Sequence, residues 1–79
     1  MGFETDRKFG QHLRNLRMER RWTQEQICAK LQLIGCDMTR GAYAKIESGT
    51  RHLYLDDLLA LQKVLHVSFD ELLHFKGDS

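Results

Sequence analysis

The residue types that could perform catalysis or hold a metal ion are scattered along this 79-residue chain. Cys28 and Cys36 are eight positions apart and belong to no CxxC pair, and the four histidines fall in four different segments. Metal ligands usually come in closely spaced pairs, and the chain has no glycine-rich phosphate loop and no nucleophile motif. We therefore expect no catalytic residue, no enzyme activity, no cofactor, no metal and no small-molecule substrate.

Basic side chains that could meet phosphates are concentrated in the first two thirds of the chain. Residues 1–52 carry ten Lys and Arg against six Asp and Glu, a net +4, whereas residues 53–79 carry two against five, a net −3. Such an asymmetry would orient one side of the molecule toward a polyanion. Ordinary solvated helix faces would give the same counts, so the charge distribution alone does not distinguish a polyanion-binding side from an ordinary surface.

Apolar residues recur at helical spacing in five segments, which predicts an all-α fold. The first helix is expected from about Asp6 to Arg20, with Phe9, Leu13 and Leu16 on one face. The fourth is rich in leucine and is expected to be the central element of the core. Its leucines are Leu55, Leu58, Leu59, Leu61 and Leu65.

Capping residues indicate where three other helices begin. Thr23 and Gln26 have the capping-box spacing, and so do Ser68 and Glu71. Thr39 is suited to cap the third helix.

The chain has the size of one small domain. It contains no proline, no long linker and no repeat, so we expect residues 1–79 to form a single domain with an ordered core at about residues 6–75. No stretch approaches the roughly 18 apolar residues of a membrane span, and no signal peptide is recognisable. We expect a cytoplasmic protein without a membrane partner.

The segment Thr23–Gly49 predicts two short helices joined by a turn that contains Gly35. In many domains a helix pair of this kind places its second helix in the major groove of DNA. The connection is long, and its apolar residues Leu33, Ile34 and Met38 are expected to be buried.

The third helix is expected to have an inward and an outward side. Tyr43 and Ile46 form an i, i+3 apolar pair and are assigned inward, and Gly49 is expected to end the helix in a left-handed conformation. Arg40 and Lys45 are then the only long polar side chains facing outward. The outward set is Thr39, Arg40, Gly41, Ala44 and Lys45.

The order of these landmarks resembles the Cro and lambda-repressor-like helix-turn-helix family, also called the XRE family. The resemblance spans about residues 7–74 and implies a compact five-helix lambda-repressor-like domain with the helix-turn-helix in helices two and three. The matching residues are Gly10, Leu13, Leu16, Arg17, Thr23, Gln24, Glu25, Ile27, Tyr43, Lys45, Ile46, Glu47 and Gly49, followed by Leu55 to Leu73.

The resemblance also implies sequence-specific binding of double-stranded DNA by a transcriptional regulator, repressor-like and bacterial or phage in origin. Its recognition helix, about Thr39–Ser48, would enter the major groove, where Arg40 and Lys45 could donate to guanine O6 and N7. Gln24 and Arg51 would contact phosphates. The protein would be nucleoid-associated when bound to DNA.

Two further expectations follow from the family pattern. Arg17 and Glu47 match an ion pair that fixes the angle of the third helix. Family members usually form homodimers, and the apolar residues Leu72, Leu73 and Phe75 are the candidate contact between subunits, although capping the core of a monomer would explain them equally well.

The main alternative is a protein-interaction module of the same fold, such as an antitoxin, an anti-repressor or an adaptor. The weak net charge of +1 favours it. So do the small residues Gly41, Ala42 and Ala44, which leave the third helix poor in hydrogen-bonding groups.

Overall fold

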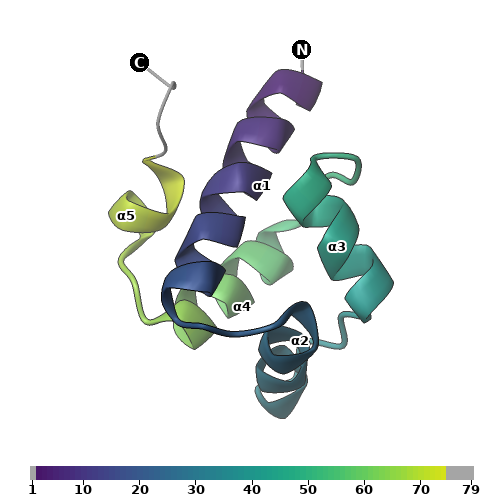
Figure 1. Cartoon of the computed structure of the whole chain (residues 1–79), viewed down its shortest axis with the longest axis vertical. Helices are drawn as coiled ribbons and strands as arrows, with labels where there is room; N and C mark the ends of the chain where they lie inside the picture. Colours follow the sequence, from purple (N-terminus) through teal and green to yellow (C-terminus); the bar gives the residue numbers. More distant parts are fainter. Residues whose placement is uncertain (1, 75–79) are drawn as a thin grey trace.

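The computed structural model describes residues 2–74, with side chains from residue 4 onward. Within that range the chain forms five helices and no strand, which confirms the all-α prediction (Figure 1). Their bounds are α1 Gly2–Glu19, α2 Gln24–Leu33, α3 Arg40–Ser48, α4 Leu55–Leu65 and α5 Phe69–Leu73. Helix α1 packs against α3 and α5, and α2 packs against α3 and α4. None of these helices combines the length and the apolar character needed to cross a bilayer.

The predicted caps start three of the helices. The Thr23 hydroxyl accepts a bond from the Gln26 amide nitrogen at 3.0 Å, and the Gln26 side chain accepts one in return from the Thr23 nitrogen at 2.8 Å. Thr39 caps α3 by accepting from the nitrogen of Ala42 at 3.1 Å. Ser68 accepts from the Glu71 nitrogen at 3.0 Å, which is one half of the box predicted there.

Helix α1 begins four residues earlier than predicted, at Gly2. No residue with a capping side chain stands directly before Gly2, so the local signals that mark the other helices could not find this turn. Glu4 supports it with ion pairs to Arg7 at 3.2 Å and to Lys8 at 3.9 Å, because side chains three and four positions apart meet on a helix.

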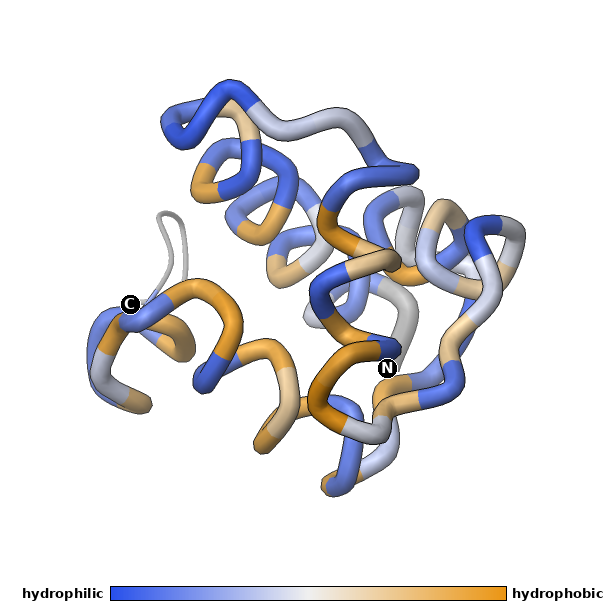
Figure 2. The backbone as a smooth tube through the Cα atoms, turned by 90° about the horizontal axis from the view of Figure 1, so that it is seen from below, coloured by the Kyte–Doolittle hydropathy of each residue, from blue (hydrophilic) through white to orange (hydrophobic). Residues whose placement is uncertain are grey.

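The core gathers side chains from all five helices. The residues predicted to face inward from the first three helices are buried, and Met38 joins them from the turn before α3. Figure 2 shows hydrophobic residues interspersed with hydrophilic ones along the helices. The buried apolar side chains include Phe9, Leu13, Leu16, Ile27, Cys28, Leu31, Tyr43, Ile46, Leu61, Leu65 and Leu72.

Two leucines of α4 do not belong to this core, contrary to prediction. Leu55 and Leu59 are exposed, whereas the buried stripe of α4 is Ala60, Leu61, Val64 and Leu65. Only one side of α4 is covered by neighbouring helices. Leu55 and Leu59 lie outside that stripe, although their residue type matches it.

The turn between α2 and α3 also differs from prediction, because Leu33 and Ile34 are exposed. Helix α2 buries Leu31, and a residue two positions later points to the opposite side of a helix. Gly35 then turns the chain with a φ of +91°, which brings Met38 back to the core.

The short helix α5 closes the domain over α1. The His12 Nε2 atom lies 2.9 Å from the Glu71 carbonyl oxygen, and Leu72 is fully buried. Leu72 therefore caps the core of its own chain, which is one of the two roles that the sequence left open for it. Leu73 is exposed, and Phe75 lies outside the described residues.

Candidate DNA-binding surface

Helix α3 lies at the edge of the molecule, on the opposite side of α1 from α5 (Figure 1). Tyr43, Ile46 and Glu47 are its buried residues. Gly41 and Lys45 are exposed on the other side, and Ala44 between them is half-buried. The side of α3 predicted to face outward therefore does so.

Arg40 lies in the first turn of α3, where its guanidinium is 3.5 Å from the carboxylate of Glu25 on α2. Both side chains are more than half exposed. An exposed pair of this kind contributes roughly 0 to 1 kcal/mol. Arg40 can therefore exchange Glu25 for another acceptor at little cost.

Gly41 has open space where a side chain would begin. A Cβ atom at Gly41 would meet nothing within 4 Å apart from its chain neighbours and the backbone of its own helix. The packing of this chain therefore gives no reason for a glycine in the first turn of α3. A surface approaching from outside would give one, because it could come closest to the backbone at this point.

A buried ion pair fixes the back of α3 against α1. The Arg17 guanidinium donates two hydrogen bonds to the Glu47 carboxylate, at 2.7 and 3.1 Å, and a third to the Trp22 carbonyl oxygen at 2.7 Å. The Arg17 side chain is 10% exposed and that of Glu47 is 5% exposed. The bidentate geometry restricts the angle between the two helices as well as their separation.

The charges of this pair are mutually stabilised. Burial alone would raise the pKa of the Glu47 carboxyl, but the hydrogen bonds from Arg17 and Gln24 and the positive charge of Arg17 act against it, and the pKa is lowered. The bonds to Glu47 in turn raise the pKa of Arg17. Burial raises the pKa of the adjacent Tyr43 hydroxyl, and the carboxylate raises it further. That hydroxyl has no hydrogen-bond partner among the described residues.

Gln24, expected to contact a phosphate, is joined to the same network. Its amide nitrogen donates to Glu47 Oε1 at 3.0 Å, across the junction between the start of α2 and the end of α3. A side-chain amide has two N–H groups, so one remains for a second acceptor. Gln24 is half-buried beside the exposed Thr23 and Glu25.

Arg51, the second phosphate candidate, is turned toward α4. Its Nη1 atom lies 3.8 Å from the Asp57 carboxylate, and its guanidinium lies 5.5 Å from the centre of the Tyr54 ring. These contacts hold the side chain in the loop after α3, with 30% of it exposed. Its predicted role would require the exposed part to face the phosphate.

Ser48 belongs to the outward side of α3 but was not among the predicted site residues. It is exposed, and its hydroxyl donates to the Lys45 carbonyl oxygen at 3.1 Å and lies 2.9 Å from the Thr50 hydroxyl. Helical spacing could have found it, because Ser48 follows Ala44 by four positions and Gly41 by seven. No group of three or more metal-binding side chains is assembled anywhere within residues 2–74.

Two short helices joined by a turn, the second with one side open to solvent and the other fixed to the core, define a helix-turn-helix protein. A family model described as a helix-turn-helix domain matches residues 8–75. The chain belongs to this family, consistent with its resemblance to the Cro-like and XRE proteins. No curated protein and no solved structure gave a significant match.

Proposed function

We propose that this protein is a sequence-specific regulator of transcription that binds double-stranded DNA by placing the outward side of α3 in the major groove. Membership of the helix-turn-helix family indicates DNA binding. The observation that carries the finer proposal is the contrast between the two sides of α3. One side is held against α1 by the ion pair between Arg17 and Glu47, whereas the other side exposes Gly41 and Lys45 to solvent.

The surface suits a duplex in three respects. Lys45 and Arg40 carry the long donors that can reach guanine O6 and N7. Gly41 allows the backbone of α3 to approach the base edges closely. Arg51 and the second N–H group of Gln24 flank the helix and would contact phosphates, which set the register on the duplex.

A protein-interaction role remains a second candidate, and one observation favours it. Leu33 and Ile34 form an exposed apolar surface at the end of α2. This surface lies at the opposite end of α2 from Gln24, so a protein contact there need not replace DNA binding.

The test is a selection of random duplexes by the purified protein, followed by binding measurements on variants. We expect an enriched motif and, for Lys45→Ala, relaxed selectivity at one position with a loss of about 1 to 3 kcal/mol on the preferred sequence. Arg14→Ala removes another exposed cation, from α1, and should change neither property. Failure to enrich any motif in dilute buffer would overturn the proposal.

A further inference from the structure

An open apolar groove, the α2–α4 groove, lies between the side of α2 and the last turns of α4. Two adjoining hollows of about 330 and 320 Å³ form it, and Trp22, Lys30 and Leu33 line both of them. Ile34 and the buried Val64 complete the hollow on the side of α4. Leu33 is 86% exposed, although a leucine is usually buried. An apolar surface left open in this way commonly marks a contact with another molecule.

The charges around the α2–α4 groove have one sign. The Lys30 Nζ atom lies 4.7 Å from the centre of the Trp22 ring, and Lys63 and His66 line the hollow beside α4. Neither hollow has a carboxylate among the described residues that line it. An occupant that carries carboxylates next to its apolar side chains would therefore meet complementary charges, whereas a basic occupant would be repelled.

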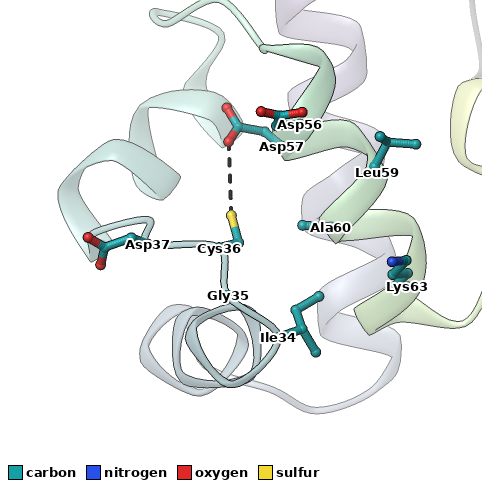
Figure 3. A pocket seen from close by; sticks show the side chains of 9 residues that line it. All are labelled: Ile34, Gly35, Cys36, Asp37, Asp56, Asp57, Leu59, Ala60 and Lys63. Atoms are coloured by element: carbon teal, nitrogen blue, oxygen red, sulfur yellow. Dashed lines mark hydrogen bonds between the residues drawn. The ribbon is translucent and has the colours of Figure 1, made fainter.

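The basic surface ends where the groove meets a third hollow. Ile34 and Lys63 line both the groove and this hollow. Figure 3 shows that Asp56 and Asp57 lie on the side of the third hollow that is away from Ile34. An acidic occupant that continued past Ile34 would meet like charges there. The stretch of complementary charge is therefore confined to the α2–α4 groove.

The shape of the groove suits a helical segment better than a small molecule. A small-molecule pocket encloses most of the surface of its ligand. The α2–α4 groove does not enclose an occupant in this way, because Leu33 and Ile34 on its side are themselves exposed. An amphipathic helix needs only an apolar groove for one of its faces and leaves the other face in water.

We propose that the α2–α4 groove binds an acidic amphipathic helix of a different protein. Apolar side chains of that helix, three and four positions apart, would pack on the apolar residues of the groove, and its carboxylates would face Lys30 and Lys63. The groove extends along α2 from Gln26 to Leu33, which is a rise of about 10 Å, so about two turns of the partner helix would fit.

This contact goes beyond DNA binding and does not depend on it. Neither α3 nor Gln24 contributes to the described lining of the two hollows. A partner seated in the groove therefore leaves the outward side of α3 open. The domain can then hold a duplex and the partner helix at the same time.

Trp22 makes the groove directly observable, because it is the single tryptophan of the chain. The test is a selection, by the full-length protein, from a library of peptides that lack tryptophan and are roughly 15 residues long, the length at which isolated helices begin to form. Leucines are fixed at helical spacing and every other position is randomised between Glu and Lys. We expect Glu-rich peptides whose binding changes the emission of Trp22 until the groove is saturated.

Three outcomes of this selection would overturn the proposal. They are the enrichment of Lys-rich peptides, the enrichment of peptides that leave the emission of Trp22 unchanged, and no enrichment at all.

A substitution in the groove tests whether a selected peptide lies there. Leu33→Glu should weaken its binding by roughly tenfold or more, because the variant removes an apolar contact and adds a charge of the same sign as the peptide. Leu55→Glu is the matched control and should leave the affinity unchanged, because Leu55 is also exposed but lines neither hollow. Equal weakening by the two variants would overturn the assignment of the groove.

Charge reversal tests the acidic character of the partner. Lys63→Glu should weaken the binding of a Glu-rich peptide several-fold and strengthen the binding of the same peptide with Lys in place of Glu. Arg14→Glu makes the same charge change at an exposed position of α1 outside the groove and should affect neither peptide. The same response to both variants would overturn the choice of an acidic partner.

Discussion

Gly41 is the residue whose identity the protein's own packing does not explain. Since a Cβ there meets open space, Gly41→Ala should stabilise the fold by roughly 0.4 to 1 kcal/mol through the reduced entropy of the unfolded chain. The added methyl group would separate α3 from a duplex, so DNA affinity should fall by about tenfold, or 1.4 kcal/mol. Thermal unfolding and a binding titration on the same sample measure both. A stabilised variant with unchanged affinity would show that the DNA does not approach this point.

The ion pair of Arg17 and Glu47 should dominate the stability contributed by charged residues. Glu47→Ala leaves the Arg17 guanidinium buried without its carboxylate, which costs roughly 3 to 5 kcal/mol. Glu25→Ala removes only an exposed partner of Arg40 and should change the stability by less than about 1 kcal/mol. Urea unfolding of the two variants provides the comparison. Equal midpoints would contradict a structural role for the pair.

The lowered pKa of Glu47 gives this stabilisation a pH dependence. Because the folded-state pKa lies below the ordinary value of 4.5, the contribution is complete above about pH 4.5 and is lost as the pH falls through the folded-state pKa. Glu47→Gln cannot titrate, so the difference in unfolding free energy between wild type and this variant should be constant near neutral pH and shrink in acid. Urea unfolding from about pH 7 to pH 3 measures it. A difference that stays constant throughout would contradict the lowered pKa.

The position of α3 depends on how closely α1 approaches it. A Cβ atom on Gly10 would lie within 3.0 Å of backbone atoms of Ile46 and Glu47, so neither helix can accept a side chain there without moving. Gly10→Ala should destabilise the domain by about 1 to 3 kcal/mol despite the better helix propensity of alanine. Gly41→Ala is the control, because it makes the same substitution in open space.

If Gly10→Ala also shifts α3, DNA binding should weaken by more than the unfolded fraction accounts for. Affinity measured well below the melting temperature separates the two effects. A variant as stable as the wild type would show that the helices separate freely, which would contradict the rigid placement of α3.

Local signals in the sequence sufficed to predict α2, α3 and most of the core. The hydroxyls of Thr23 and Thr39 accept hydrogen bonds from backbone N–H groups three residues further along the chain. Gly49 ends α3 in the left-handed conformation, with a φ of +78°, which glycine adopts easily because it has no side chain. The apolar face of a helix is likewise set by its own periodicity. These features need no knowledge of where the other helices lie.

The remaining features depend on tertiary contacts. Leu33 and Leu59 are of a residue type that is usually buried, yet both are exposed. Which side of α2 or α4 is buried depends on where the neighbouring helices lie. The contact of Gln24 with Glu47 joins α2 to α3, and that of Arg51 with Asp57 joins the loop after α3 to α4; neither had a sequence signal. Both residues remain predicted phosphate contacts.

The charge asymmetry of the whole domain determines how DNA binding should respond to salt. The first 52 residues carry a net charge of +4 and the remainder −3, so the molecule as a whole, at +1, has little attraction for a polyanion unless its basic side faces it. Affinity should therefore arise from a few specific phosphate contacts. Each contact contributes a slope of about −0.9 to the logarithm of the binding constant against the logarithm of salt concentration.

Removing one phosphate contact should change the slope by the amount that this contact contributes. Arg51→Ala should weaken binding to all sequences alike and make the slope shallower by about 0.9, because one phosphate is no longer neutralised. Arg14→Ala, which makes the same charge change on α1, should leave the slope unchanged. Titrations at several salt concentrations measure it. An unchanged slope for Arg51→Ala would show that Arg51 contacts Asp57 and Tyr54 but no phosphate. A wild-type affinity indifferent to salt would contradict DNA binding by this surface and favour the protein-interaction candidate.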